Sequence, residues 1–319
     1  QQYNSGNALK YAYKSASSSS WTKTTVDNTG GKYTSIATDS NNNPHIAYRD
    51  SGGDMGYATK SSGASWTYGT VQSAGDIAFT SIAVDADDHV HIAYYDANNK
   101  DMYHLTNTSG SWARTFLEDI GTNTGGTALD IAIDPTTDEP GISYFDMDAT
   151  SLKYTYYTGS AWSSTTVEDS ADYGRFNSIV YDSAGNVHIS HERNSADDLY
   201  YTSDKTGTWV STAVDTTNSV GTHTSIAVDS NDDLHIAYRH NSFSRTMHAT
   251  VQGYKISSAD RANVSGATCS ISPSLPFGLS LNQGTCTISG TPTSHGFNTT
   301  YNVTATSVSY THLTLPTTR

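Results

Sequence analysis

The sequence predicts an all-β protein whose body is a β-propeller, and three observations lead to this fold class. An Ile-containing run recurs every 46 to 49 residues, each repeat unit holds four short strand-like runs, and no segment has helical periodicity. The composition agrees, because the chain has 22 Tyr and is rich in Thr, and aromatic and β-branched residues favour strands. Four-stranded units that stack on one another are typical of propeller blades. A solenoid is the alternative that the same period allows.

The first two strands of each unit form a predicted hairpin. The first strand ends in an Asp in every copy: Asp39, Asp85, Asp134, Asp182 and Asp229. The second strand begins six or seven residues later, at His45, His91, Gly141, His188 and His235. The links are rich in Asp, Asn, Ser, Gly and Pro, which stabilise turns. We expect Ile to pack against one neighbouring blade, and the small Ala or Ser against the other.

The third and fourth strands complete each unit, and they suggest how the ring closes. The third run is rich in Tyr, and the fourth begins at a Trp: Trp21, Trp66, Trp112, Trp162 and Trp209, which are all five Trp of the chain. The N-terminus carries only the last two runs, and the last copy carries only the first three. We therefore expect five four-stranded blades, with the strand after Trp21 completing the last one. Because residues 9–14 and 247–251 compete for one third-strand position, a sixth, composite blade is the alternative.

The charge balance narrows the choice of partners. The chain has 31 acidic and 17 basic residues, for a net charge of −14. This charge repels phosphate backbones and anionic lipids, so we expect no nucleic-acid or membrane-surface partner, and cations are favoured as small ligands. No apolar run approaches the ~20 residues of a membrane-spanning helix. The chain starts at Gln1 without a Met or a signal-like segment, so we expect a processed chain or a fragment.

After the propeller, expected over residues 1–254, and a linker, 255–264, the sequence changes character. Three motifs follow in order: LPFGLSL at 275–281, ISGTPT at 288–293 and YNVTA at 301–305. With them, residues 265–309 resemble the immunoglobulin-like modules of prokaryotic cell-surface proteins. The resemblance implies a β-sandwich, here a fragment much shorter than the ~100 residues of a full Ig domain. Residues 310–319 do not continue the pattern, and we expect them to be non-native sequence.

The two cysteines of the chain, Cys269 and Cys286, both fall in this segment. The Ig-like resemblance implies that they lie on paired strands and form a disulfide. Such a bridge would stabilise the fold by roughly 3 kcal/mol in the chain-entropy model and suits an oxidising compartment. Two reduced, buried thiols are the alternative. We therefore expect an extracellular or cell-surface protein.

The repeated His and Asp residues are better explained by architecture than by metal binding. A His that recurs on the same strand of successive blades is too dispersed around a ring to meet the others at one ion. The Asp at the end of each first strand is expected to cap its hairpin. One weak calcium site remains, because Asp229, Asn231 and Asp233 place oxygens at alternating positions, although the Gly and distant Glu of an EF-hand are missing. No other cofactor is expected.

The turns before the Trp residues carry a second resemblance. The Ser/Thr-Gly-x-Trp pattern, clearest at 203–209, resembles the Asp-boxes of sialidase-like propellers in degenerate form. The chain is thereby similar to prokaryotic cell-surface repeat propellers. In sialidase-like propellers the box lies between the outer two strands of a blade, which implies that the Trp side chains pack between blades. Exposed Trp faces that stack on sugar rings are the functional alternative.

Departures from the repeat identify candidate functional residues, because a site needs residues that the architecture does not. Asp50, Asp96 and Asp146 follow the second strand in three copies, whereas Arg193 and the pair Arg239 and His240 stand there in the last two. We predict that these residues bind a ligand at one rim of the ring. His191 and Glu192, next to Arg193, are the candidate acid-base pair if the protein is an enzyme.

These observations favour a non-catalytic extracellular protein that serves adhesion, glycan binding or scaffolding. An incomplete Ig-like module could also accept a strand from a second copy, so a homopolymeric filament is a version of this hypothesis. Two alternatives remain open: a polysaccharide-active enzyme that uses one face of the propeller, and a propeller that binds a surface protein.

Overall fold

The computed structural model describes residues 8–73, 75–122, 129–169, 173–193, 197–217, 219–242, 244–251, 267–272, 275, 279–282, 287–290, 302–307 and 313–316. In this part of the chain every regular element is a β-strand, and no helix is long and apolar enough to cross a bilayer. The chain divides into two compact units, Gln1–Val228 with Ile236–Ala249, and Asp229–His235 with Thr250–Arg319. The all-β fold class is confirmed.

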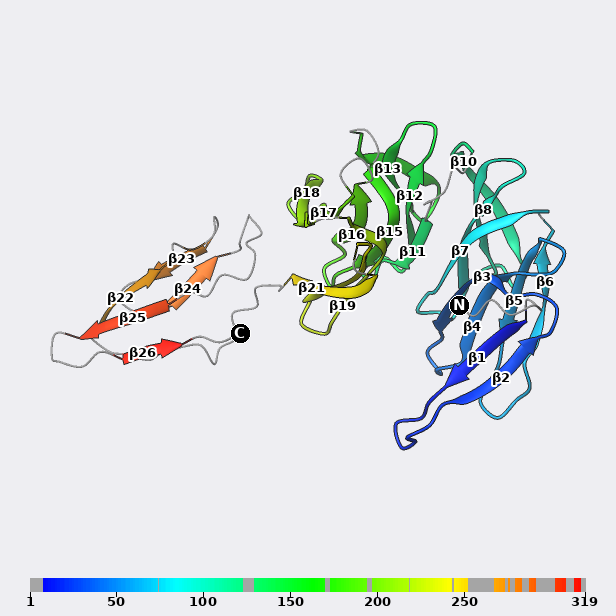
Figure 1. Ribbon diagram of the computed structural model, residues 1–319, viewed down its shortest axis with the longest axis horizontal. Coiled ribbons are helices and arrows are strands. Elements are labelled where there is room, and N and C mark those ends of the chain that lie inside the picture. Colours follow the sequence, from blue (N-terminus) through cyan, green and yellow to red (C-terminus); the bar gives the residue numbers. More distant parts are fainter. Residues whose placement is uncertain are drawn as a thin grey trace. The chain divides into compact units, whose positions relative to one another are not determined.

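The first unit is built of blades in sequence order (Figure 1). Blade 1 contains β3 (Lys32–Thr38), β4 (Pro44–Arg49), β5 (Met55–Thr59) and β6 (Thr67–Gln72), and blade 2 contains β7 (Ile77–Val84), β8 (Val90–Asp96), β9 (Asp101–Thr106) and β10 (Ala113–Asp119). Blade 3 contains β11 (Leu129–Ile133), β12 (Pro140–Asp146), β13 (Ser151–Tyr157) and β14 (Trp162–Glu168), and blade 4 contains β15 (Tyr173–Tyr181), β16 (Val187–Arg193), β17 (Asp198–Ser203) and β18 (Val210–Asp215). Each is a four-stranded antiparallel meander.

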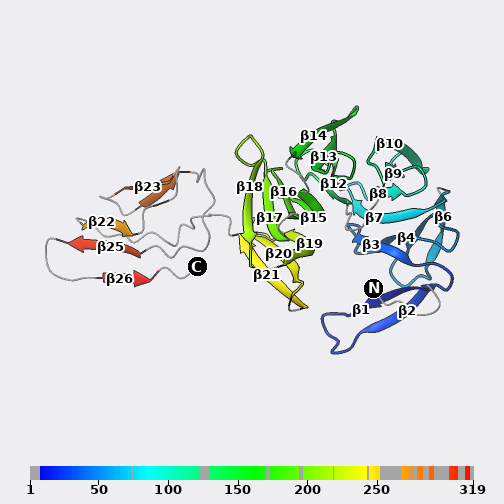
Figure 2. The same cartoon turned by 45° about the horizontal axis from the view of Figure 1, so that its top comes forward.

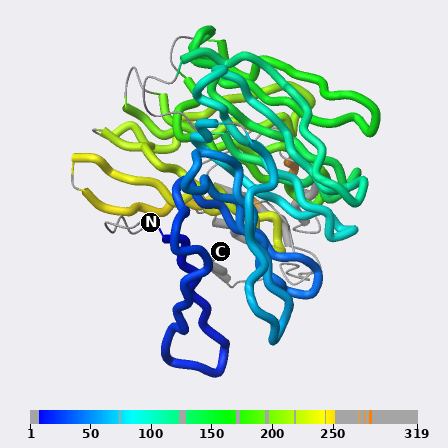
Figure 3. The backbone as a smooth tube through the Cα atoms, turned by 90° about the vertical axis from the view of Figure 1, so that its right-hand side faces the viewer, coloured from blue at the N-terminus to red at the C-terminus, as the bar shows by residue number. Residues whose placement is uncertain are grey.

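Blade 5 has three strands, β19 (Val220–Val228), β20 (Leu234–His240) and β21 (Arg245–Val251). The N-terminal strands β1 (Leu9–Tyr13) and β2 (Thr22–Asp27) form their own two-stranded sheet, so the expected pairing of the strand after Trp21 with blade 5 is not among the ladders of the described residues. The reason lies in packing. Leu9 and Val26 share a buried cluster with Ile46 and Tyr48 of blade 1, and the N-terminal hairpin, in dark blue, lies beside blade 1 (Figure 3).

Successive blades pack face to face, as the repeat predicts (Figure 2). At the seams between blades 1 and 2 and between blades 2 and 3, small residues of one blade share a buried cluster with large residues of the next. Ala47 of blade 1 packs with Ile92 of blade 2, and Ala93 of blade 2 packs with Ile142 of blade 3. These side chains are fully buried. Burial of an aliphatic side chain contributes about 1.5–3 kcal/mol, so the seams are the main source of stability.

A polar belt joins the first strands of neighbouring blades. In each case a side-chain oxygen accepts the backbone N–H of an Ile in the next blade: Ser35 from Ile82 at 3.2 Å, Ser81 from Ile131 at 3.4 Å, Asp130 from Ile179 at 3.0 Å and Ser178 from Ile226 at 3.3 Å. Asp130 is the one carboxylate in this set and also accepts from the hydroxyls of Ser81 and Ser178. Burial raises the pKa of Asp130 despite these donors.

The Asp at the end of each first strand caps its hairpin, as predicted. The Asp39 carboxylate accepts the backbone N–H groups of Asn41 at 2.9 Å and Asn43 at 2.7 Å, and Asp85, Asp134, Asp182 and Asp229 make similar bonds. One residue of each hairpin has positive φ: Asn42, Asp88, Asp138, Gly185 and Asp232. Asn, Asp and Gly tolerate this region best, which explains the composition of the links.

The second unit contains the C-terminal strands β22 (Ala267–Ser272), β23 (Leu279–Asn282), β24 (Thr287–Gly290), β25 (Asn302–Ser307) and β26 (Leu313–Pro316). Strands β22, β25 and β26 form one sheet, and β23 pairs with β24. The segment 310–319, expected to be foreign, thus contributes β26, which pairs with β25. Cys286 lies outside the described residues, so the disulfide with Cys269 stays a prediction.

Candidate functional site

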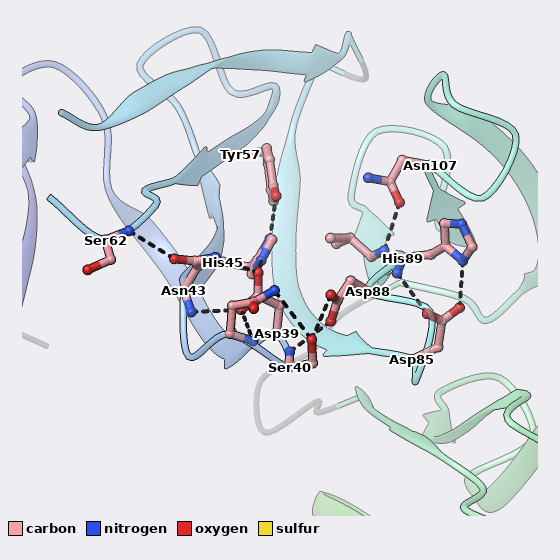
Figure 4. A network of polar contacts seen from close by, with 12 residues as sticks. Asp39, Ser40, Asn43, His45, Tyr57, Ser62, Asp85, Asp88, His89 and Asn107 are labelled. Carbon is pink, nitrogen blue, oxygen red and sulfur yellow. Dashed lines mark hydrogen bonds and ion pairs between the residues drawn. The ribbon is translucent and has the colours of Figure 1, made fainter. Parts of the chain in front are cut away.

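A relay of Asp, His and Tyr recurs at the hairpin end of the blades. In blade 1, the His45 ring lies 3.4 Å from the Asp39 carboxylate and 2.5 Å from the Tyr57 hydroxyl (Figure 4). In blade 4, His188 stands 3.3 Å from Asp182 and 2.6 Å from the hydroxyl of Tyr201. The His therefore joins the hairpin cap to the third strand. Its recurrence is explained by architecture, as the sequence indicated.

A Trp from the following blade covers the third-strand aromatic side chain at four seams. The ring centroids are 5.0 Å apart for Tyr11 and Trp66, 4.9 Å for Tyr57 and Trp112, 4.9 Å for His104 and Trp162, and 5.6 Å for Tyr154 and Trp209. Four of the five Trp thus occupy matching places, and packing between blades is their common role. Trp21 differs, because it is 61% exposed.

Blade 3 lacks the His of the Asp-His-Tyr arrangement, and a residue of blade 4 fills the space that the missing side chain leaves. Gly141 replaces the His, and the hydroxyl of Tyr181 from blade 4 fills the space, 2.6 Å from the hydroxyl of Tyr154. A Cβ atom at position 141 would stand 1.9 Å from the Tyr181 hydroxyl oxygen. Gly141 and Tyr181 are therefore a matched pair, and the sequence break at Gly141 is structural.

Blade 2 departs from the relay and leaves a hollow. His104 replaces the third-strand Tyr, and a pocket of about 470 Å³ opens between blades 2 and 3. Its lining includes three His (His89, His91, His104), four acids (Asp85, Asp87, Asp138, Glu139) and two aromatic residues (Tyr157, Trp162), with Thr106, Thr108, Thr115, Thr137 and Pro140. A concave site with a few convergent polar groups and an aromatic wall is typical of small-ligand pockets.

The blade 2 side of the pocket is a chain of hydrogen bonds centred on His91. Its Nε2 lies 3.1 Å from the Asp85 carboxylate, and its Nδ1 lies 3.0 Å from Nε2 of His104. Burial lowers the pKa of His91 against the attraction of Asp85, and burial together with repulsion from His91 lowers the pKa of His104 to about 3. Both imidazoles are therefore neutral near pH 7.

The protonation pattern follows from these bonds. Burial disfavours the charged form of Asp85, but hydrogen bonds from His91 and from the backbone N–H of His89 outweigh it and lower the pKa of that carboxyl. Ionised Asp85 only accepts, so His91 donates through Nε2 and accepts at Nδ1, and His104 donates through Nε2. His104 then carries a lone pair on Nδ1, for which none of the described residues supplies a hydrogen-bond donor.

The blade 3 side of the pocket carries Asp138 and Glu139, at the hairpin between β11 and β12. Asp138 accepts the backbone N–H of Ala86 at 2.9 Å, which ties this hairpin to blade 2, as Asp88 ties blade 2 to Ser40 of blade 1 (Figure 4). Burial and repulsion from Asp138 and Asp85 raise the pKa of Glu139. The pocket is thus rich in acceptors and negative in potential.

The structure places His191 and Glu192, the candidate acid-base pair, in the interior. Both lie within β16 and are buried, with at most 1% exposure. His191 accepts from or donates to Thr202 at 2.8 Å, and burial lowers its pKa to about 4. Neighbouring residues of a strand point to opposite faces of the sheet. The two side chains are therefore not brought together at an accessible cleft.

The predicted ligand residues lie at the end of the second strand, Asp96 and Asp146 as its last residue and Asp50 directly after it. Each carboxylate accepts backbone N–H groups of its own turn, among them Gly52 for Asp50 at 2.8 Å and Asn98 for Asp96 at 3.0 Å. Asp146 also pairs with Lys153 at 2.8 Å. These contacts give the Asp column a structural role, at the end of the second strand opposite to the pocket.

The remaining predicted ligand residues, Arg193, Arg239 and His240, do not form a shared site in the described contacts. The Arg193 guanidinium stacks over the Tyr173 ring at 4.8 Å and donates to the Tyr200 hydroxyl at 3.4 Å. Arg239 is exposed on β20, whereas His240 is buried. Arg193 thus joins the first and third strands of blade 4, β15 and β17.

The calcium candidate is a hairpin of the common type. Asp229 accepts the backbone N–H of Asn231 at 2.8 Å and of Asp233 at 3.0 Å, and its second oxygen lies 3.7 Å from His235. In the described part of the chain, no group of three His, Cys, Asp or Glu side chains has the arrangement of a metal site.

Sequence reasoning missed the pocket, although a signal existed. The third-strand position holds Tyr57, Tyr154 and Tyr201 in three blades and His104 in blade 2, so the break was visible in the repeat. The Asp-box resemblance is not confirmed. In blade 4, Asp204 accepts the backbone N–H of Val187 at 2.8 Å, which pins the outer turn to the second strand.

Comparisons with known proteins agree with the fold. The family described as "Putative Ig domain" matches residues 206–318, a range that begins upstream of the expected module and includes strands of blades 4 and 5. No curated protein matches the chain at a significant level. The chain is similar to a mutant of Aleuria aurantia lectin in complex with Fucalpha1-6GlcNAc, with 12% identity, a TM-score of 0.54 and coverage of 76% of this chain and 84% of the lectin.

A second solved structure is similar to the same extent. A mutant of AofleA from Arthrobotrys oligospora has 11% identity and a TM-score of 0.55, with coverage of 79% of this chain and 84% of AofleA. The exo-beta-1,3-galactanase of Clostridium thermocellum has 10% identity and a TM-score of 0.40, with coverage of 70% and 59%. At such identities the two likenesses with a TM-score above 0.5 show the fold alone, a β-propeller.

Proposed function

We propose that this protein is a non-catalytic glycan-binding propeller that binds a sugar in the pocket between blades 2 and 3. The observation that carries the proposal is the pocket itself. It is a hollow of about 470 Å³ that combines the indole of Trp162 with carboxylates, Thr hydroxyls and an imidazole. Sugars present an apolar ring face and a rim of hydroxyls, which match an aromatic wall and convergent polar groups.

The comparisons support the sugar as ligand class without establishing it. The Aleuria aurantia lectin is a propeller of related shape whose solved complex contains a fucosylated disaccharide. The match of residues 206–318 to the family "Putative Ig domain" agrees with the C-terminal Ig-like resemblance, which implies a surface role. We extend the proposal accordingly to an extracellular or cell-surface protein for adhesion.

The enzyme hypothesis has less support from the geometry. The only acid-base pair that the sequence singled out, His191 and Glu192, is buried. A filament of strand-exchanged copies remains a further hypothesis for the C-terminal unit. There β26 already pairs with one edge of β25, so a donated strand would have to replace it or use another edge.

The test compares two tryptophans that share one packing role. Trp162 lines the pocket, whereas Trp209 covers Tyr154 at the seam between blades 3 and 4. The full chain is screened on a glycan array, and the best ligand is measured by calorimetry against Trp162→Ala and Trp209→Ala. Loss of the indole from the pocket should weaken binding by about tenfold, or ~1.4 kcal/mol, while Trp209→Ala binds as the native chain does.

Two results would reject the proposal. One is that no glycan binds the folded chain. The other is that Trp162→Ala and Trp209→Ala bind equally well, because a site elsewhere on the protein would then be responsible.

A further inference from the structure

The charged side chains that line the pocket are all carboxylates, beside Thr, Tyr and Trp groups that can also donate hydrogen bonds. Asp85, Asp87, Asp138 and Glu139 present carboxylates, and none of the described residues that line the pocket is a Lys or an Arg. Asp85 is partly satisfied by His89 and His91, and Asp138 accepts one backbone N–H. No hydrogen bond or ion pair of the described residues engages the Glu139 side chain, which is half-buried and feels the charges of Asp138 and Asp85.

A second feature of the pocket, the imidazole of His104, points the same way. His104 is 5% exposed, yet it lines the pocket. The hydrogen bonds from Asp85 through His91 fix Nε2 of His104 as a donor and leave its Nδ1 as an acceptor, for which the described residues supply no hydrogen-bond donor. This nitrogen is not among the fully buried, unpartnered atoms of the described residues, so it is accessible to a donor from a bound molecule.

We propose that the pocket selects hexosamines with a free amine, bound as the ammonium ion, over N-acetylated, neutral and anionic sugars. An ammonium group offers three donors and no acceptor, which suits the acceptors of the pocket. Its hydrogen bonds to carboxylates are charge-assisted and about twice as strong as neutral ones. The indole of Trp162 is placed to cover the apolar ring face. Uronic or sulfated sugars would add a further negative charge to a pocket that is already lined by four acidic residues.

This inference rests on the proposed glycan function and names its ligand. The experiment measures the affinity of the full chain by calorimetry near pH 6.5 for three oligosaccharides of similar length: a β-1,4-glucosamine oligomer, its N-acetylated counterpart and an oligogalacturonate. We expect the free amine oligomer to bind at least tenfold more tightly than the acetylated one, and the oligogalacturonate to show no measurable binding. The affinity for the amine oligomer should also fall as salt is raised.

Two carboxylate variants localise the effect. Glu139→Gln keeps the shape of the pocket and removes one charge, so the preference for the free amine should fall by about tenfold or more. Asp119→Asn removes a charge from the end of β10, outside the pocket lining, where the carboxylate caps Gly121, and it should leave the preference unchanged. Far-ultraviolet circular dichroism verifies the fold of each variant, and the salt dependence of the native chain gives a readout that needs no variant.

The outcomes separate this inference from the function on which it rests. Equal affinity for free and acetylated oligomers, or binding of the oligogalacturonate, overturns the amine selectivity and leaves glycan binding intact. An equal loss of preference in Glu139→Gln and Asp119→Asn also overturns it, because general charge would then explain the effect. Failure of every glycan to bind rejects the proposed function and the inference together.

Discussion

The seams between blades 2 and 3 and between blades 3 and 4 are built from the same repeat, but only the seam between blades 2 and 3 contains a pocket at the position where the repeat is broken. Both have a Trp of the later blade over a third-strand aromatic side chain, His104 at one seam and Tyr154 at the other. At the second seam the Tyr181 hydroxyl occupies the space that Gly141 leaves. At the first seam, the break at His104 is accompanied by a pocket of about 470 Å³.

The difference shows how to separate structural from functional departures in a repeat. A break that another residue fills restores packing, and both partners can be explained by the fold alone. A break that leaves a hollow lined by carboxylates and imidazoles gains nothing for packing, because voids cost stability. The seam between blades 2 and 3 is of this second kind, so we assign the function there.

The largest loss of stability is expected from a substitution at the seam between blades 3 and 4, where Tyr181 fills the space beside Gly141. Gly141→Ala places a methyl group 1.9 Å from the present position of the Tyr181 hydroxyl oxygen, so one of the two must move. Overpacking together with loss of the bond to Tyr154 should lower the free energy of unfolding by about 3 kcal/mol. Urea denaturation monitored by Trp fluorescence measures the change.

A second variant tests the assigned cause. Tyr181→Phe in the Gly141→Ala background removes the oxygen that the methyl group meets, and it should restore a large part of the lost stability. If the double variant is no more stable than Gly141→Ala, the pairing of Gly141 with Tyr181 is not the reason for the missing His.

The fold was predictable because its determinants are local and repeated. The hairpin Asp, the link composition and the Ile run each recur within a few residues, so the propeller and the Asp caps followed from the sequence. The separate N-terminal sheet did not follow, since the choice between pairing with β21 and packing on blade 1 depends on contacts such as Leu9 with Ile46. The sequence shows that two segments compete for one third-strand position, but it does not show which of the two arrangements has the lower free energy.

The candidate site was not predictable in the same way. A carboxylate that caps a turn and one that binds a ligand look alike in the sequence, and this led to Asp50, Asp96 and Asp146. The pocket depends instead on residues far apart in the chain, such as His104 and Trp162, which meet only because blades 2 and 3 stack. Its signal was one substitution in a Tyr column, which has no meaning until the seam is seen.

An intermediate effect on stability is expected when His104, at the seam between blades 2 and 3, is replaced by the Tyr that stands at this position in blades 1, 3 and 4. The pKa of His104 is lowered to about 3 in the folded chain, against about 6.5 when unfolded. Between these values the unfolded chain binds a proton that the folded chain does not, so the contribution of neutral His104 is complete above pH ~6.5 and decreases as the pH falls toward ~3. His104→Tyr removes this loss and restores the residue that pairs with His in blades 1 and 4.

The measurement is the free energy of unfolding of both chains at neutral pH and at pH 5. Relative to its value at neutral pH, the native chain should lose about 2 kcal/mol more at pH 5 than His104→Tyr, since each pH unit is worth ~1.4 kcal/mol. Other groups with lowered pKa, such as His191, are present in both chains and cancel in the difference. Parallel pH profiles for the two chains would mean that His104 takes up a proton in the folded state.

The smallest effect is expected at Trp21, the one indole without a seam of its own. Trp66 packs on Tyr11 at 5.0 Å, whereas Trp21 is 61% exposed, and Ile36 of the first strand of blade 1 is 55% exposed although its counterparts in later blades are buried. Trp21→Ala should therefore change the free energy of unfolding by less than ~0.5 kcal/mol, against about 2 kcal/mol for Trp66→Ala. Equal losses would show that Trp21 packs as the other four do. The N-terminal hairpin would then act as the outer strands of a closed ring, as the repeat pattern suggests.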